Sequence, residues 1–317
     1  AISSVSPSKG VAEGGTSVTV WGHGFAAMAG SARTMLCRFS TLKTAAQYVN
    51  ESAIVCTSPA TAPGLMFVDV SINAQEYTAT GLEFEVVAVT IHRLVPWIGP
   101  NVGGTEVTVS GVNLASVTSL PSLQCEFASL RVDASLHSSD SVRCASPVGL
   151  ATGWSAVKLL SSLGPLRSSS SFYVHSRIFI SSLTPSFGPT EGGSKVIVVG
   201  VGFPSASRVH CRFGVTSSES VARHVSSQEL ECQTPASAAS GAVTVEVTIN
   251  GQQYSGSTLA YTYQNAAAVS SIWPSVGIAG GGTPVTVVGA GFLPSAASLL
   301  CRFNTTIVPA LYKTATA

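Results

Sequence analysis

The sequence predicts an all-β protein made of tandem β-sandwiches, and three observations lead to this prediction. A set of motifs returns every 89 residues along the 317-residue chain. Each copy contains short segments in which apolar and polar residues alternate, the pattern of half-buried strands. Gly, Pro and Ser separate these segments, and no window has a helical period. Units of this size with about seven short strands are typical of β-sandwiches.

The repeat begins with a proline, then a Gly-Gly pair, then an alternating strand. In the first copy this strand contains Val18 and Val20, which we expect to face the core because the opposite phase would bury Thr19. The prolines are Pro7, Pro96, Pro185 and Pro274, and the glycine pairs are Gly14-Gly15, Gly103-Gly104, Gly192-Gly193 and Gly281-Gly282.

The repeat divides the chain into three complete units and the front half of a fourth. We place repeat 1 at residues 1–88, repeat 2 at 89–176, repeat 3 at 177–266 and the partial repeat 4 at 267–317. The pattern breaks off within repeat 4, so we interpret the chain as an excerpt of a longer protein. A sandwich of about 89 residues buries only somewhat over 60% of its unfolded surface, so a covalent link would stabilise it appreciably.

Six of the seven cysteines supply such a link, because one pair recurs in each complete repeat. The expected disulfides, at sequence separations of 19, 19 and 21, are Cys37–Cys56, Cys125–Cys144 and Cys211–Cys232. Closing a loop of this length is worth roughly 3 kcal/mol in the chain-entropy model. Cys301 is left over, and we expect its partner beyond the end of the given chain.

Two other interpretations of the cysteines, as free thiols or as zinc ligands, fit the sequence less well. Buried thiols of a cytosolic protein would not be expected to recur as one pair per repeat. Zinc sites would need closely spaced cysteines or histidines, but there is no Cys-x-x-Cys and the six histidines do not recur at equivalent positions. Disulfides are therefore favoured, and they place the chain outside the cell or in the secretory pathway.

The order of these motifs resembles the IPT/TIG immunoglobulin-like domain in tandem. Repeat 3 matches best, with Pro185, Gly200-Val-Gly202-Phe203, Cys211-Arg-Phe-Gly214 and Cys232-Gln-Thr-Pro235. Repeat 2 departs most, with Gly111-Val-Asn113-Leu114 in place of Gly-x-Gly-Phe. The resemblance implies early-set immunoglobulin-like β-sandwiches. Such domains occur in stalks of cell-surface receptors, in giant ectodomains, beside starch-acting enzymes and in some transcription factors, so the fold does not choose the function.

Composition excludes several classes of function. Charged residues are 10% of the chain, against about 25% in ordinary domains, and the net charge is +1 without any basic run. Nucleic acid is therefore not an expected partner. No run of 18 or more apolar residues occurs, so we expect no membrane span in this segment. Only three aspartates are present, which argues against calcium sites between the repeats.

Catalytic motifs are weak. Gly22-His-Gly24 and its counterparts lack the third glycine and the following helix of a dinucleotide site, and no Gly-x-Ser-x-Gly is present. Two carboxylate pairs could each share a strand face, as a catalytic acid–base pair would, namely Glu83 with Glu85 and Glu229 with Glu231. Ordinary solvent-exposed positions on a strand explain these pairs better. We predict that the chain is not an enzyme and holds no catalytic, cofactor-binding or metal-binding residues.

Two sequons predict N-linked glycans, at Asn50 and Asn304. The serine run 168–171 is interpreted as a mobile turn or an O-glycosylated one. The four tryptophans suggest a sugar-stacking platform, but they lie at mostly unrelated repeat positions, so we favour core or inter-domain packing for Trp97 and Trp273.

The segments between repeats are short and apolar, as in Val86, Val87 and Val89, where a flexible linker would be polar. Adjacent sandwiches should therefore pack end to end and form a semi-rigid rod. The leading hypothesis is a structural segment of a large extracellular glycoprotein, as a stalk or as part of a filament or coat. Its partners would be neighbouring repeats, other copies or other extracellular proteins. The alternatives are the ligand-binding or adhesion ectodomain of a receptor, and accessory domains of a carbohydrate-active enzyme.

Overall fold

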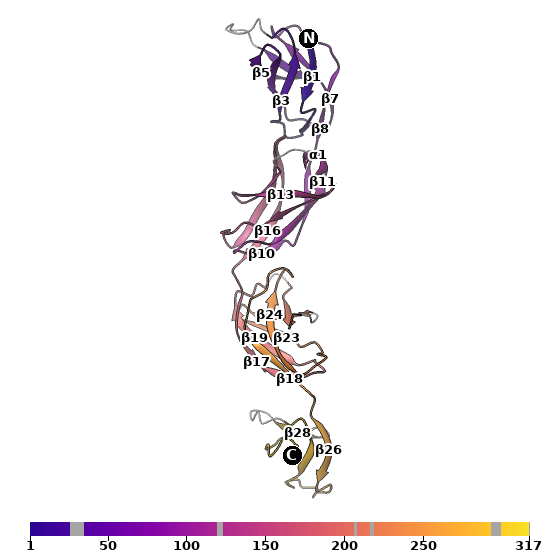
Figure 1. The fold of residues 1–317 in the computed structure, drawn as a ribbon, viewed down its shortest axis with the longest axis vertical. Coiled ribbons are helices and arrows are strands. Elements are labelled where there is room, and N and C mark those ends of the chain that lie inside the picture. Colours follow the sequence, from indigo (N-terminus) through magenta and orange to yellow (C-terminus); the bar gives the residue numbers. More distant parts are fainter. Residues whose placement is uncertain (26–34, 119–122, 206–207, 216–218, 293–298, 317) are drawn as a thin grey trace. The chain divides into compact units, whose positions relative to one another are not determined.

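The computed structural model describes residues 1–25, 35–118, 123–205, 208–215, 219–292 and 299–316. These residues form two compact units, Ala1–Arg177 and Ile178–Ala317. The first unit contains repeats 1 and 2, and the second contains repeat 3 and the partial repeat 4 (Figure 1). Nearly all regular structure is β-strand, which confirms the all-β prediction. One helical turn, α1 (Ala115–Thr118), is the only helix in the described residues.

Repeat 1 is a β-sandwich in which one long strand belongs to both layers. Its strands are β1 (Ile2–Ser6), β2 (Lys9–Val11), β3 (Ser17–Gly22), β4 (Leu36–Phe39), β5 (Leu42–Asn50), β6 (Ala53–Thr57), β7 (Gly64–Ser71) and β8 (Leu82–Val87). The hydrogen-bonded order is β1-β3-β6-β5-β4-β7-β8-β2. The first residues of β5 pair with β4 and its later residues pair with β6, so β5 crosses from one layer to the other.

Repeat 2 has the same topology. Its strands are β9 (Thr90–Val95), β10 (Ile98–Pro100), β11 (Glu106–Val112), β12 (Gln124–Phe127), β13 (Leu130–Ser138), β14 (Ser141–Ala145), β15 (Gly153–Ser161) and β16 (Gly164–His175). Their order is β10-β16-β15-β12-β13-β14-β11-β9, and β13 is the strand shared by both layers. The short strand β10 runs parallel to β16, as β2 runs parallel to β8 in repeat 1.

Repeat 3 keeps this arrangement but divides the shared strand in two. Its strands are β17 (Phe179–Thr184), β18 (Phe187–Pro189), β19 (Lys195–Val201), β20 (His210–Phe213), β21 (Ser220–Val221), β22 (Arg223–Ser226), β23 (Glu229–Gln233), β24 (Gly241–Thr248) and β25 (Ala260–Gln264). They form two sheets, β17-β19-β23-β22 and β18-β25-β24-β20-β21. Residues 249–259 connect β24 to β25, which pairs antiparallel with it.

The partial repeat 4 forms two small sheets of two strands each. They pair β26 (Ala268–Trp273) with β27 (Thr286–Ala290), and β28 (Leu300–Phe303) with β29 (Thr306–Pro309). The proline that opens each of the four repeats follows a cis peptide bond. Equivalent positions of the repeated sequence thus have equivalent backbone conformations.

The core of each complete repeat is lined by the valines that alternation predicts. Val18 and Val20 of β3 are fully buried, and so are Val107 and Val109 of β11. Thr19, on the opposite side of β3, is half-buried. The predicted phase of these strands is therefore confirmed.

Each complete repeat contains one disulfide, and it joins the two layers of the sandwich. In repeat 1, Cys37 lies in β4 of one layer and Cys56 lies in β6 of the other. The bonded pairs, which are those that the repeat predicts, are Cys37–Cys56, Cys125–Cys144 and Cys211–Cys232. Their Cα atoms are 6.2 to 6.3 Å apart, and all six side chains are at most 2% exposed. Cys301 has no disulfide partner among the described residues.

An aromatic pair lies beside each disulfide. The phenylalanine of the Cys-x-Phe strand meets a ring of the last long strand edge to face, with centroids 5.3 to 5.5 Å apart. The pairs are Phe39 with Phe84, Phe127 with Phe172, and Phe213 with Tyr261. This close packing also explains a repeated glycine, because a Cβ at Gly99 would overlap the Thr105 hydroxyl and the Phe172 ring.

The turn after each Cys-x-Phe strand needs a left-handed residue. Gly214 has this conformation in repeat 3, with a φ of 83°. Ser40, Ala128 and Asn304 occupy the same place in the other repeats, with φ values of 54°, 54° and 55°. The Ala128 N–H donates to the Ala156 carbonyl at 2.8 Å, so the turn is hydrogen-bonded to the neighbouring strand β15. A left-handed residue with a Cβ costs about 1 kcal/mol relative to glycine.

We therefore expect Ala128→Gly to stabilise repeat 2. The relief of backbone strain exceeds the added chain entropy of glycine, so the free energy of unfolding should rise by about 0.5–1 kcal/mol. Chemical denaturation of the full chain measures this change. Ala145→Gly, at an exposed strand end with ordinary φ, is the matched control and should lower stability instead. Equal effects of the two substitutions would contradict the assignment of strain to Ala128.

Candidate functional site: the junction between repeats 1 and 2

The first two repeats share a hydrophobic core where they meet. Val11 of β2, Val87 of β8 and the linker residue Val89 belong to the buried cluster of repeat 2. They are 1%, 7% and 2% exposed. Residues of repeat 1 therefore complete the core of repeat 2, and the linker is part of that core. This confirms, for the first junction, that the apolar linker packs the two sandwiches against each other.

Hydrogen bonds fix the same junction. The Thr16 hydroxyl of repeat 1 donates to the Leu163 carbonyl of repeat 2, and both residues are buried. The Asn113 side-chain amide donates to the carbonyl of Ala88 in the linker at 2.8 Å. Asn113 is the residue at which repeat 2 departs from the Gly-x-Gly-Phe pattern. That departure therefore supplies a polar contact to the linker.

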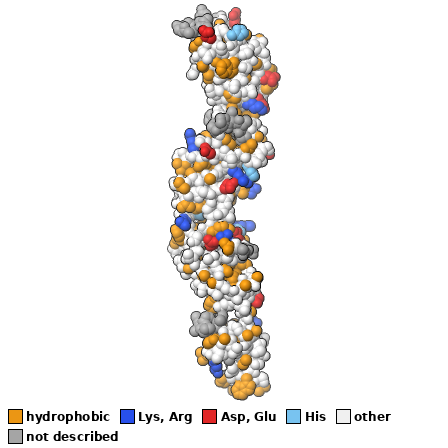
Figure 2. Space-filling model, viewed as in Figure 1, with side chains coloured by type: hydrophobic (Ala, Val, Ile, Leu, Met, Phe, Trp, Pro, Cys, Tyr) orange, Lys and Arg blue, Asp and Glu red, His pale blue; other side chains and the backbone are white. Residues whose placement is uncertain are grey.

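One member of each carboxylate pair considered as a catalytic candidate takes part in ion pairs. Glu85 pairs with Lys9 at 2.7 Å. Glu231 accepts hydrogen bonds from Arg223 and Lys195, and these lower its pKa, so it stays a charged structural partner rather than a proton donor at neutral pH. Charged side chains form separate spots on the visible face of the molecule (Figure 2). Among the described residues, no group of three or more His, Cys, Asp or Glu could hold a metal ion.

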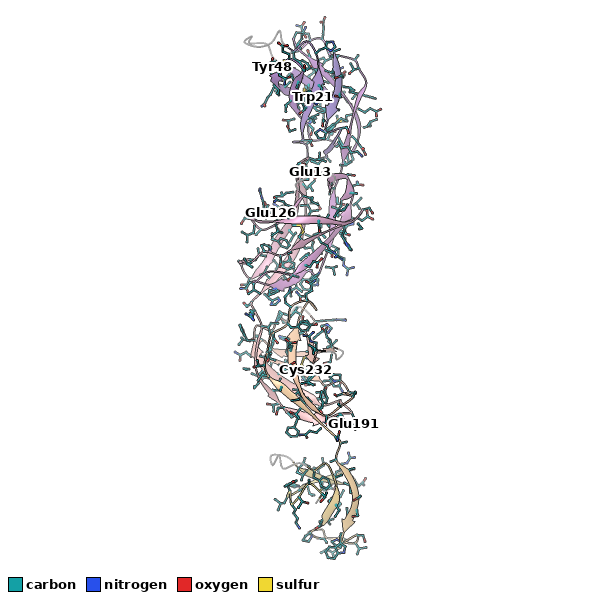
Figure 3. All side chains as sticks on the ribbon, in the orientation of Figure 1. Glu13, Trp21, Tyr48, Glu126, Glu191 and Cys232 are labelled. Atoms are coloured by element: carbon teal, nitrogen blue, oxygen red, sulfur yellow. A yellow bond between two sulfur atoms is a disulfide. The ribbon has the colours of Figure 1, made fainter. Side chains whose placement is uncertain are left out.

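The middle residue of Cys-x-Phe carries a role that sequence reasoning missed. Arg38 and Arg212 point outward from these strands. Each pairs with an acid on a hydrogen-bonded neighbouring strand and lies against a tyrosine ring. The partners are Asp69 and Tyr77 in repeat 1, and Glu246 and Tyr254 in repeat 3. Repeat 2 reverses the charges, since Glu126 of β12 lies opposite Lys158 of β15 (Figure 3 labels Glu126). The reversal is readable in sequence only when the strand register is known.

All four tryptophans are exposed, so a core position for Trp97 and Trp273 is wrong, whereas the alternative of inter-domain packing stays a prediction. Trp97 is 38% and Trp273 is 76% exposed, and Trp21 is 43% exposed (Figure 3 labels Trp21 on repeat 1). Trp97 stacks on Trp154, which also meets the ring of Tyr173. We call Trp97, Trp154 and Tyr173 the aromatic shelf. Trp154 and Tyr173 lie on the paired strands β15 and β16, and Trp97 lies in the bend just before β10, an arrangement that their spacing in the sequence does not indicate.

The predicted glycan sites lie in exposed turns. Asn50 ends β5, is exposed, and accepts a hydrogen bond from the Ser52 N–H at 2.9 Å. Asn304 is exposed in the turn between β28 and β29. Their occupancy stays a prediction. The interpretation of residues 168–171 as a turn is wrong, because they lie inside β16, where the Ser168 hydroxyl accepts a hydrogen bond from the Ile91 N–H.

A cleft of about 220 Å³ lies within the second unit. Its lining combines apolar residues such as Phe187 and Phe292 with the amide residues Gln264 and Asn265, and it contains no titratable side chain. We find no arrangement for acid–base or nucleophilic chemistry there. No helix in the described part of the chain is long and apolar enough to cross a membrane.

His175 is the buried titratable group nearest the end of repeat 2. It is the last residue of β16 and is 8% exposed, and its Nδ1 lies 2.7 Å from the Ser176 carbonyl oxygen. Burial lowers its pKa from the usual 6.5, and the hydrogen bond to the carbonyl opposes this only in part. The neutral imidazole is therefore the form that the folded repeat favours.

The family of the chain follows from comparison with known proteins. The sequence profile of the IPT/TIG domain matches residues 1–86, 89–174 and 179–263. The chain belongs to the IPT/TIG domain family. Each match lies inside one predicted repeat, and each complete IPT/TIG domain contains one of the inter-layer disulfides.

The relatives that this chain matches are much longer proteins. Human Fibrocystin-L is 24% identical over 302 residues, which cover 92% of this chain and 7% of that protein. Plexin-2 of Caenorhabditis briggsae is 26% identical over 210 residues, which cover 64% of this chain and 11% of that protein. Among solved structures, the full extracellular region of plexin A4 aligns with a TM-score of 0.45 at 17% identity, covering 99% of this chain and 28% of that one. The chain thus spans a small part of the relatives it matches.

We predict that Val11→Ala destabilises repeat 2 although Val11 belongs to repeat 1. Loss of two buried methyl groups should cost about 2 kcal/mol and speed hydrogen exchange of the β11 amides. Val20→Ala removes the same atoms from the core of repeat 1 and is the control, with little effect on β11. Native-state hydrogen exchange of the full chain separates the two. Equal protection of β11 in both variants would contradict the shared core.

We also predict that the free energy of unfolding of repeat 2 decreases at low pH because His175 becomes protonated. Its pKa is lower in the folded than in the unfolded state, so the unfolded chain binds more protons as pH falls below about 6.5. The contribution of neutral His175 is complete above that pH and is lost toward the lower folded pKa. Thermal unfolding at about pH 7.5 and about pH 5.5 should show a larger decrease for the wild type than for His175→Gln, which cannot titrate. Identical decreases would refute this role.

Proposed function

We propose that the chain is a non-enzymatic structural segment of a large extracellular multi-repeat glycoprotein. In this proposal it forms a semi-rigid stalk or part of a filament or coat. The observation that carries the proposal is the shared core of repeats 1 and 2, because burying a linker between domains restricts their relative motion. A segment that only joined independent binding domains would not need Val89 buried or the Thr16 hydroxyl bonded across the junction.

The disulfides support the extracellular part of the proposal. All three complete repeats hold one, and such bonds persist in oxidising compartments. The low charge supports a shielded or assembled state, because a surface with few charges risks association. Glycans at Asn50 or contacts with neighbouring chains would provide that shielding.

Small-angle X-ray scattering of the purified chain tests the stalk. A compact 317-residue globule would have a radius of gyration of about 20 Å, and a stalk should exceed it well. The value should be nearly the same at low and high salt, since the junction is apolar. A radius near that of a globule, or one that depends strongly on salt, would rule out a semi-rigid stalk.

Protein from its native source tests the assembly and the extracellular location that we propose. Antibody labelling in electron micrographs should place this segment on fibres, coats or membrane-attached stalks, and unreduced peptide mapping should find the three disulfides. Reduced cysteines in the native protein would contradict the extracellular proposal. Isolated stalks without lateral assembly would remove the filament version while keeping the stalk.

A further inference from the structure

The aromatic shelf is an exposed and internally fixed cluster on one outer face of repeat 2. Trp154 of β15 lies directly opposite Tyr173 of β16, and Tyr173 in turn pairs with the start of β10, next to Trp97. The Trp97 and Trp154 rings are 5.8 Å apart at 16° to each other, and Trp154 meets Tyr173 at 5.2 Å. Trp154 nevertheless remains 65% exposed. The rings hold one another in place, so little side-chain entropy is left to lose on binding.

The fold does not require these rings. The register places Trp97, Tyr173 and Trp154 at the same positions as Ser8, Glu85 and Leu65 in repeat 1, and as Ser186, Thr262 and Ala242 in repeat 3. Repeats 1 and 3 form the same sandwich without an aromatic residue there. The shelf is therefore a feature of repeat 2 alone among the three complete repeats, and its cause lies outside folding.

The size of the shelf favours a small ligand over a protein partner. Two tryptophans exposed to 38% and 65% present roughly 250 Å² between them, given about 250 Å² for a large aromatic side chain. A stable protein interface needs about 800 Å² from each partner. A flat patch of this area with its polar surroundings matches the face of a ring-shaped ligand.

The surroundings of the shelf are polar but balanced in charge. Ala156 and Lys158 continue the exposed face along β15, and Ser171 and Ser169 lie opposite them on β16. Glu126 lies beside Lys158 and pairs with Arg131 at 3.1 Å. From Trp154 to Lys158 this face extends about 14 Å. Among the side chains that the structure describes on this face, the cations Lys158 and Arg131 are matched by the carboxylates of Glu126 and Asp133, so the face offers hydroxyl, ammonium and carboxylate hydrogen-bonding groups.

We propose that repeat 2 binds a neutral pyranose chain on this face. The apolar C–H face of a sugar ring stacks on Trp154 and Trp97, while hydroxyl groups of following rings bond Ser171, Lys158 and Glu126. An open, flat face suits an extended oligosaccharide rather than a single sugar, which would need an enclosing pocket. The site is separate from the junction with repeat 1 and gives the stalk a carbohydrate ligand.

The test is a titration of the full chain with cellohexaose, xylohexaose, mannohexaose and chitohexaose. Isothermal calorimetry and tryptophan fluorescence should detect saturable binding of at least one. Trp154→Ala should weaken that binding at least about tenfold, and Trp154→Phe should restore part of it because it keeps a ring. Trp21→Ala and Trp273→Ala remove exposed tryptophans from other repeats and should leave the affinity within about twofold.

The oligosaccharide titration and the tests of the stalk proposal can fail independently, because neither the radius of gyration nor the disulfides depend on Trp154. Trp154→Ala should leave repeat 2 folded with only a small decrease in its unfolding temperature, because the side chain is mostly exposed and loses only its contacts with Trp97 and Tyr173. Absence of binding for all four oligosaccharides, or binding unchanged in Trp154→Ala, would overturn the proposal. Self-association that Trp154→Ala abolishes would instead assign the shelf to a second copy of this chain.

Discussion

The disulfide between the two layers is the constraint on which each repeat depends. The strand that carries Cys37 also carries Phe39, and alternation turns both side chains inward. One short strand thus supplies the covalent link and the ring that packs on Phe84. A stabilisation of roughly 3 kcal/mol from the link is large beside the 5–15 kcal/mol typical of whole domains. With its layers joined, a small sandwich can carry exposed or strained features elsewhere.

A rigid sandwich allows function to be placed on its surface and at its ends. Val11 of repeat 1 packs in the core of repeat 2, and the linker between the repeats is buried in the same core. The outer face of repeat 2 carries Trp154 without cost to the fold, because the residues facing inward from the same strand already supply its share of the core. The proposed mechanical role and the proposed ligand site would therefore use different surfaces of the same IPT/TIG domain.

Much of the fold could be predicted from sequence, because recurrence of the motifs determines the strand boundaries and the cysteine pairs that no single motif determines. Alternation gave the phase of Val18 and Val20, and recurrence gave the pairing of Cys125 with Cys144. The aromatic shelf could not be predicted, because Trp154 and Tyr173 meet through the register of β15 with β16, and Trp97 is brought to them by the pairing of β10 with β16. Ala128 was also missed, since nothing in its local sequence indicates a left-handed turn except comparison with Gly214. Both depend on pairing between distant segments rather than on local patterns.

Removing one inter-layer disulfide tests the central claim most directly. Denaturant unfolding of the full chain carrying Cys125→Ala and Cys144→Ala, compared with the wild type under oxidising conditions, measures its contribution to repeat 2. The account predicts a decrease in the free energy of unfolding of roughly 3 kcal/mol, confined to the transition of repeat 2 and its junction. A variant that unfolds at the wild-type denaturant concentration would contradict the dependence of the sandwich on this link.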